Sequence, residues 1–165
     1  MAHASPWMMA AALLVACASD DDGSGPSVGG NARCAEDEYA LEGTLAGEVI
    51  SQRGVLRNHT WVQSGSRNTL DTDFENRGRV HTQWDQLIRD GASTAVTGSI
   101  TMPPGATRAG AVVNAASGAM SKQGDEVRFE LTSLSESVEC FAPPCPPVAI
   151  EGAISGCIHW AHIGP

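Results

Sequence analysis

Histidines and cysteines are the residues of this chain best suited to catalysis or metal binding. His159 and His162 are three residues apart near the C-terminus, and two imidazoles in a tail could ligate one metal ion. On a strand, residues three apart face opposite sides, which argues against a shared ligand site. His81 could pair with Asp73 across a hairpin as an oriented base, but that pair would need a nucleophile. No serine or free cysteine has a recognisable nucleophile context, so we predict no catalytic residue, no metal site and no cofactor.

Two local motifs imitate functional sites. The stretch Gly25–Gly29 (GPSVG) fits the nucleophile elbow of hydrolases, but that motif needs a strand before its serine and a helix after it. The surrounding residues are acidic and rich in Gly and Ser, without any periodicity. The stretch Asp71–Asn76 (DTDFEN) begins like a calcium loop, yet Asn76 and Thr82 occupy the sixth and twelfth positions, where Gly and Glu are required. Neither motif therefore predicts a site.

Carboxylates and tryptophans offer two weaker possibilities. Glu42 and Glu151 occupy equivalent places in two similar segments and could form an acid–base pair, but outward-facing polar positions give the same placement. Trp61, Trp84 and Trp160 could line a sugar-binding platform. Trp84 and Trp160 fall on apolar strand faces, however, so we expect them in the core.

The first cysteine, Cys17, directly follows an apolar run. Trp7–Ala16 (WMMAAALLVA) has ten residues, the length of a secretory h-region and far too short to span a membrane. Leu14–Cys17 (LVAC) resembles the lipobox of bacterial lipoproteins, which has a large aliphatic residue, two small or aliphatic residues and then Cys. The resemblance implies cleavage before Cys17 and anchoring in the membrane through a lipid on Cys17. The residues before the run lack Lys and Arg, which departs from the class; a wrong start codon, a plain secretory signal or no signal would explain this.

The residues after Cys17 cannot build a core. Ala18–Arg33 is acidic, rich in Gly and Ser, and without periodicity, which predicts a disordered tether. We therefore divide the chain into a signal peptide (1–16), a lipid-anchored linker (17–33) and one domain (34–165). Ala18 follows the lipidated cysteine where retention in the inner membrane would favour Asp. By resemblance to lipoproteins of two-membrane bacteria, this favours the outer membrane, facing the periplasm or the cell surface.

Four cysteines remain for the domain: Cys34, Cys140, Cys145 and Cys157. An even number in an exported chain predicts two disulfides, because the envelope is oxidising. Three pairings are possible. We favour Cys34–Cys157, which would tie the ends of the domain, and Cys140–Cys145, which would close the Pro-rich loop between them. Zinc ligands would favour C-x-x-C pairs, whereas Cys140 and Cys145 are five residues apart.

The net charge of −9 argues against one class of partner. No cluster of Lys and Arg exists, so the chain lacks the electrostatic footprint of a nucleic-acid-binding protein. The acidic balance favours solubility rather than a particular ligand.

Period-two alternation dominates the domain. Tyr39–Val49 and Val148–Trp160 each alternate apolar and polar residues, which predicts two half-buried strands. Their sequences LEGTLAGEV and IEGAISGCI resemble each other, and VTGSI at Val96–Ile100 repeats the core of the pattern at spacings of 55 and 54 residues. Either a duplicated half-domain or glycines recurring at strand bends explains this.

A hairpin is predicted in the middle of the chain. Thr69–Glu75 and Arg79–Asp85 alternate in the same way and are joined by Asn76-Arg77-Gly78, with Gly78 suited to the left-handed position of the loop. If Glu75 faces Arg79, then Asp73 faces His81, Asp71 faces Gln83 and Leu70 faces Trp84. This register places all apolar side chains on one face and complementary charges on the other.

Further strands are expected at Val55–Gln63, Arg108–Ala115 and Glu126–Leu134. Short turns rich in Gly and Pro connect them, which predicts an all-β fold: a small sandwich or barrel of about seven to eight antiparallel strands. The function expected from these features is that of a lipid-anchored envelope protein with a binding or structural role and no evident catalysis. An envelope hydrolase with a site built from loops, and a small-ligand carrier with a barrel cavity, remain as alternatives.

Overall fold

The computed structural model describes residues 34–64, 67–85, 88–106, 108–136 and 146–161. Within these ranges the chain forms strands and no helix, so the all-β prediction is confirmed. The strands are β1 (Glu38–Leu45), β2 (Glu48–Ser64), β3 (Arg67–Phe74), β4 (Arg79–Trp84), β5 (Ser93–Ala95), β6 (Thr97–Thr101), β7 (Val112–Gln123), β8 (Glu126–Glu136), β9 (Val148–Ile150) and β10 (Gly152–His159). Over the described ranges, no helix is long and apolar enough to cross a membrane.

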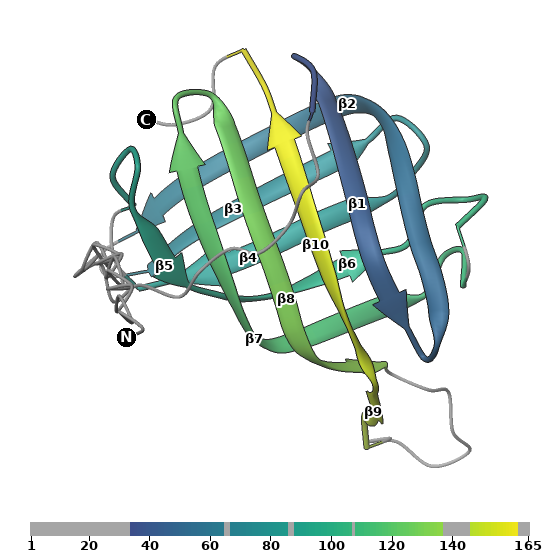
Figure 1. Cartoon of the computed structure of the whole chain (residues 1–165). Helices are drawn as coiled ribbons and strands as arrows, with labels where there is room; N and C mark the ends of the chain where they lie inside the picture. Colours follow the sequence, from purple (N-terminus) through teal and green to yellow (C-terminus); the bar gives the residue numbers. More distant parts are fainter. Residues whose placement is uncertain (1–33, 65–66, 86–87, 107, 137–145, 162–165) are drawn as a thin grey trace, which may run out of the picture.

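Eight of the strands close into an antiparallel barrel (Figure 1). The hydrogen-bonded order is β1-β2-β3-β4-β6-β7-β8-β10, and β10 returns to pair with β1. The two remaining strands are three residues each: β5 adds to β7, and β9 adds to β8. Of the two architectures that the sequence predicts, the barrel is the one that forms.

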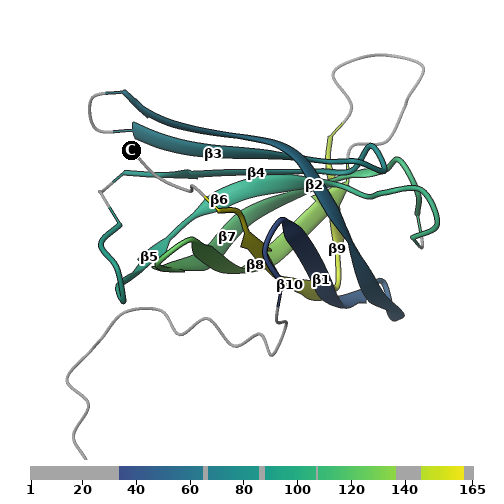
Figure 2. The same ribbon diagram turned by 90° about the horizontal axis from the view of Figure 1, so that it is seen from above.

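The barrel is flattened into two layers whose strands cross. In Figure 1, β1, β10 and β8 run steeply across the front, and β3, β4 and β6 run almost horizontally behind them. The turned view of Figure 2 separates the layer containing β3 and β4 from the layer containing β1, β8 and β10. The long strand β2 joins the layers, because its first half pairs with β1 and its second half pairs with β3. A register shift between Leu56 and Asn58 marks this bend, as expected of a β-bulge at a barrel corner.

Side chains fill the space between the layers. Alternate residues of β3 and β8 point inward and are buried, among them Leu70, Phe74, Phe129 and Leu131. Tyr39 stacks on Phe74 with ring centroids 3.6 Å apart. Burial of this apolar surface is the main force that holds the barrel closed.

Two segments that look continuous in sequence are each divided in the structure. Tyr39–Val49 contains all of β1 except Glu38, a turn at Ala46 and Gly47, and the first two residues of β2, so the prediction of one strand was wrong. Ala46 and Gly47 both have positive φ, 52° and 81°, which is the geometry of a two-residue hairpin turn. Alanine is rare at the first position of such a turn, so the residues Ala46 and Gly47 did not indicate a turn in the sequence. Val49 is consequently 75% exposed.

The second divided segment lies at the C-terminal end of the described chain. Val148–Trp160 was expected to form one strand, but it separates into β9 and β10 at Glu151. Beyond the break the prediction holds, because Ile154 and Ile158 are both fully buried on the inner face.

One glycine in each of the three similar segments has the same environment. A Cβ added to Gly43, Gly98 or Gly152 would lie 2.1–2.2 Å from a backbone oxygen of the neighbouring strand. The neighbouring strand therefore approaches each position too closely for any side chain. This packing requirement explains why each of these three positions holds a glycine.

The predicted hairpin forms, but its register was wrong by two residues. Asp73 pairs with Arg79, Asp71 with His81, and Leu70 with Thr82 rather than Trp84. A slip of two residues keeps every side chain on its predicted face, so the alternation alone could not detect it. The loop is Glu75-Asn76-Arg77, and Arg77 takes the left-handed position with φ 66°.

Packing explains why Gly78 lies outside that loop. The amide of Phe74 donates to the Gly78 carbonyl at 2.8 Å, which places the two residues opposite each other. A Cβ on Gly78 would approach the Phe74 ring to 2.6 Å. A glycine is therefore needed at position 78 because the Phe74 ring lies against it. Arg77, and not Gly78, adopts the left-handed conformation of the turn.

Tyr39 is the single tyrosine of the chain and gives a direct test of this interior. It is fully buried, and its hydroxyl accepts a hydrogen bond from Asn76 Nδ2 at 2.7 Å. Burial raises the pKa of the phenol above its usual value, and the hydrogen bond from Asn76 partly opposes this.

We therefore expect tyrosinate absorbance to appear at higher pH in the folded protein than in the chain unfolded by urea. Below the pKa of the unfolded chain both states keep the proton. Above it the unfolded state loses the proton first, so the free energy of unfolding falls as pH rises through the folded pKa. Asn76→Ala should raise the folded pKa further and cost about 1 kcal/mol of stability. Identical titration curves for the folded and unfolded chain would contradict the buried position of Tyr39.

Candidate binding site

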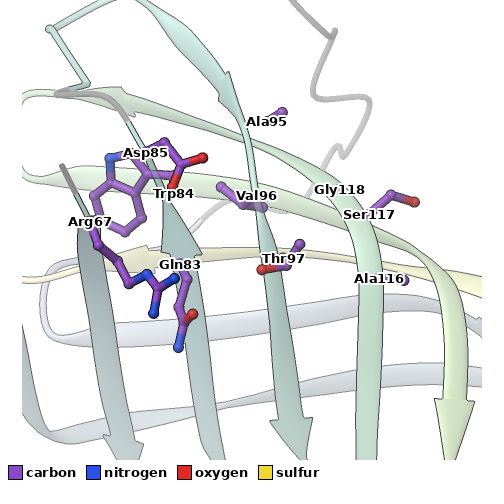
Figure 3. Close-up of a pocket in the computed structure, with 10 residues that line it drawn as sticks. All are labelled: Arg67, Gln83, Trp84, Asp85, Ala95, Val96, Thr97, Ala116, Ser117 and Gly118. Atoms are coloured by element: carbon purple, nitrogen blue, oxygen red, sulfur yellow. The ribbon is translucent and has the colours of Figure 1, made fainter.

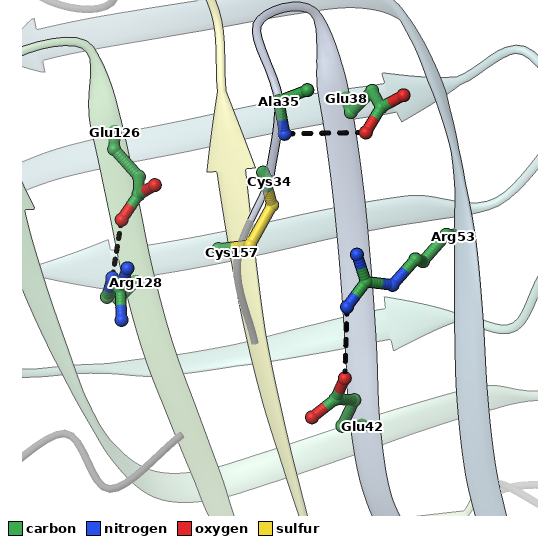
Figure 4. The surroundings of a disulfide bond; sticks show 8 residues. All are labelled: Cys34, Ala35, Glu38, Glu42, Arg53, Glu126, Arg128 and Cys157. Atoms are coloured by element: carbon green, nitrogen blue, oxygen red, sulfur yellow. Dashed lines mark hydrogen bonds and ion pairs between the residues drawn. A yellow bond between two sulfur atoms is a disulfide. The ribbon is translucent and has the colours of Figure 1, made fainter. Parts of the chain in front are cut away.

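The disulfide between Cys34 and Cys157 is the one predicted pairing that falls within the described residues, and the structure forms it. Figure 4 shows it on the outer face of the barrel, where the segment before β1 lies against β10. Cys157 is fully buried there beside Ala40. The other predicted residues, Cys17, Cys140 and Cys145, lie outside the described part of the chain.

A cleft lies in the barrel wall beyond the end of the ladder between β4 and β6. The ladder between β4 and β6 ends at the pair Gln83 and Thr97, and the preceding strand β5 pairs with β7 instead. The opening that results, called here the wall cleft, has a volume of about 320 Å³ (Figure 3). It is lined by Arg67, Gln83, Trp84, Asp85, Ala95, Val96, Thr97, Ala116, Ser117 and Gly118.

The lining combines an apolar floor with a polar rim. Trp84 and Val96 are each 3% exposed and belong to the core, so they form the floor. Arg67, Asp85 and Thr97 are exposed, and Gln83 is half-buried. Within the described residues, no side chain forms an ion pair with Arg67 or Asp85. The cleft therefore presents one positive and one negative charge that no other described side chain neutralises.

A chain of hydrogen bonds positions Gln83 at this rim. Asp71 Oδ1 lies 2.8 Å from His81 Nδ1, and His81 Nε2 lies 2.7 Å from Gln83 Nε2. In the neutral imidazole, Nδ1–H donates to Asp71 and Nε2 accepts from the Gln83 amide. The Gln83 carbonyl oxygen is then left as an acceptor for a ligand.

The same chain of contacts corrects the expected His–Asp pair and bears on catalysis. Asp71, and not Asp73, is the partner of His81, because of the shifted register; Asp73 instead binds Arg79 at 2.7 Å. Ser99 is opposite His81 on β6. A general base would act through Nε2, but Gln83 engages that atom, and the described residues show no hydrogen bond between Ser99 and His81. The arrangement orients an amide rather than activating a nucleophile.

Of the two tryptophans expected in the core, Trp84 is there, whereas Trp160 is only partly buried and packs against it. Trp84 is buried and contacts Trp61 with ring centroids 4.9 Å apart, while Trp160 is partly buried against His59 at 4.7 Å. Buried polar atoms also gather on this side of the interior. Trp61 Nε1, Trp84 Nε1 and Asn68 Oδ1 have no hydrogen-bond partner among the described residues.

The remaining candidates are not brought together. Glu42 is bound by Arg53 at 3.4 Å, whereas Glu151 is exposed at the break between β9 and β10. His159 is paired with Glu38 across the β1–β10 ladder, and His162 lies outside the described residues. Across the described ranges, no three His, Cys, Asp or Glu residues are grouped closely enough to hold a metal ion.

Sequence reasoning did not find the wall cleft. Alternation along the hairpin could have placed Arg67, Gln83 and Asp85 on the outer face. Nothing in the residue pattern indicated that β5 would separate from β4, and this separation is what makes a cleft from them. A comparison of the chain with known families, curated proteins and solved structures finds no match to any of them.

Proposed function

We propose that this chain is a bacterial envelope lipoprotein whose barrel has a binding role. A lipid on Cys17 would anchor it in the outer membrane, and the stretch from Ala18 to Arg33 would hold the barrel away from the lipid headgroups. The observation that carries this proposal is the disulfide between Cys34 and Cys157. Such a bond is typical of an exported domain, since the cytoplasm keeps thiols reduced.

Two further features support the proposal. The LVAC sequence at Leu14–Cys17 supplies a modification site directly before the linker. The wall cleft supplies a concave surface with polar groups above an apolar floor, which is the usual composition of a ligand site. His81, the best-oriented candidate base, is engaged by Gln83, which favours binding over catalysis.

A single substitution tests the anchor. In the bacterial host that makes the protein, Cys17→Ser is expected to abolish incorporation of labelled fatty acid. The variant should then either leave the membrane fraction or remain as an uncleaved precursor. Serine lacks the thiol that the lipid requires. Ser19→Ala, two residues away in the linker, is the control and should be acylated like the wild type. Equal labelling of the Cys17→Ser variant, or no labelling of the wild type, would contradict the proposal.

A further inference from the structure

We propose that the wall cleft binds a free α-amino acid with an apolar side chain. This inference rests on the proposed binding role and specifies its ligand. An α-amino acid carries a carboxylate and an ammonium group on the same carbon. Its site therefore needs two opposite charges at neighbouring positions, an apolar surface beside them and a volume that fits a small molecule.

The charges meet the first requirement. Asn68 is paired with Trp84 at the open end of the β3–β4 hairpin, Arg67 directly precedes Asn68, and Asp85 directly follows Trp84. The two charged residues therefore lie on neighbouring strands at the same end of the hairpin. No ion pair joins them or ties either one to another described side chain. Arg67 can bind a carboxylate with two parallel hydrogen bonds, and Asp85 can accept from an ammonium group.

Gln83 supplies a third polar contact of fixed orientation. It lies on the outer face of β4 with Asp85 and lines the same cleft (Figure 3). The hydrogen bond between its amide nitrogen and His81 holds the side chain in place and leaves the carbonyl oxygen available. A second acceptor beside Asp85 suits an ammonium group, which has three hydrogens to donate.

The volume of the wall cleft and its apolar lining determine the size and side chain of the ligand. The volume of about 320 Å³ is near the lower limit of small-ligand pockets, which suits a single amino acid. Ala95 and Ala116 are exposed in the lining above the buried Trp84 and Val96, and they supply apolar surface for an aliphatic side chain. Burial of that side chain would exclude water from the two charged contacts and strengthen them.

Other classes of ligand match the residues of the wall cleft less well than an amino acid does. A sugar would require an open aromatic face for stacking, but Trp84 is only 3% exposed. A phosphate would be repelled by Asp85, and a simple cation would be repelled by Arg67. A metal ion would find Asp85 as the one carboxylate in the described lining.

Calorimetric titration of the full chain in detergent tests this inference, with leucine as the probe. N-acetylleucine keeps only the negative charge, and leucinamide keeps only the positive charge. Leucine is expected to bind saturably and more tightly than either analogue. Arg67→Gln should weaken leucine binding about 10- to 100-fold and leave leucinamide unaffected, while Asp85→Asn should do the same for leucine and spare N-acetylleucine.

Two matched controls make the result specific. Arg57→Gln and Asp125→Asn remove one exposed charge of each sign outside the cleft lining and should leave leucine binding unchanged. No saturable binding of leucine, equal losses in the controls, or full affinity in both cleft variants would overturn the inference. Each of these outcomes leaves acylation of Cys17 untouched, so failure here is distinguishable from failure of the proposed function.

Discussion

Gly43→Ala is expected to prevent the barrel from closing, although it adds a single methyl group. The new Cβ would lie 2.1 Å from the Ala153 carbonyl oxygen and 3.1 Å from Ile154 Cα, both of them backbone atoms of β10. Gly43 also has φ 150°, which an alanine rarely adopts. β1 and β10 form the ladder that returns the sheet on itself, so they cannot separate there without opening the barrel.

We expect a loss of at least about 4 kcal/mol in the free energy of unfolding, measured by urea denaturation of the full chain. Gly47→Asn is the matched control. Gly47 has φ 81° in the turn between β1 and β2, and no atom lies within 4 Å of a Cβ placed there. Asparagine tolerates this conformation, so the control should lose no more than about 1 kcal/mol. Equal stability of the Gly43→Ala variant and the wild type would contradict the close approach of β10.

The second large effect is expected from the disulfide. Cys34 and Cys157 are separated by 123 residues, so the bond restrains almost the whole domain in the unfolded state. The chain-entropy relation gives a stabilisation of about 5 kcal/mol for a loop of this length. Replacing both cysteines with serine should therefore lower the free energy of unfolding by about 4–5 kcal/mol and reduce the melting temperature markedly.

The other two cysteines provide the comparison. If Cys140 and Cys145 pair as the sequence predicts, they close a loop of only a few residues, and their replacement should cost about 2 kcal/mol. Adding a reductant to the wild type should reproduce the larger loss. A Cys34→Ser and Cys157→Ser double variant with the stability of the wild type would show that the bond contributes nothing to the fold.

The sequence predicted the class of fold and one of the disulfides because each depends on a strong local signal. Period-two alternation identifies strands and their inner faces, as at Ile154 and Ile158. An odd cysteine beside the apolar run and four others after it made two bonds the natural expectation. Neither signal depends on which strands pair with each other.

The register of the central hairpin could not be obtained in the same way. Pairing Leu70 with Trp84 or with Thr82 buries the same side chains and exposes the same charges. The choice depends on Gly78, which must lie against the Phe74 ring, and on Arg77, which takes the left-handed position usually given to glycine. Both are consequences of packing in three dimensions.

The wall cleft was beyond prediction for a related reason. Its polar residues are ordinary members of an outer strand face, and none has an unusual neighbour in sequence. The cleft exists because β5 pairs with β7 while Trp84 and Asp85 continue past the end of the β4–β6 ladder. A cleft of this kind depends on how β4 and β5 pair with other strands, which the sequence around them does not reveal.

Intact-mass spectrometry of the protein purified from its native membrane, with and without reductant, measures the lipid anchor on Cys17 and the oxidation state of the domain together. We expect a chain that begins at Cys17 and carries acyl groups, with a mass that rises by about four hydrogens on reduction, two for each disulfide. An unacylated mass that still includes Met1, unchanged by reductant, would contradict both the membrane anchor and the oxidised domain.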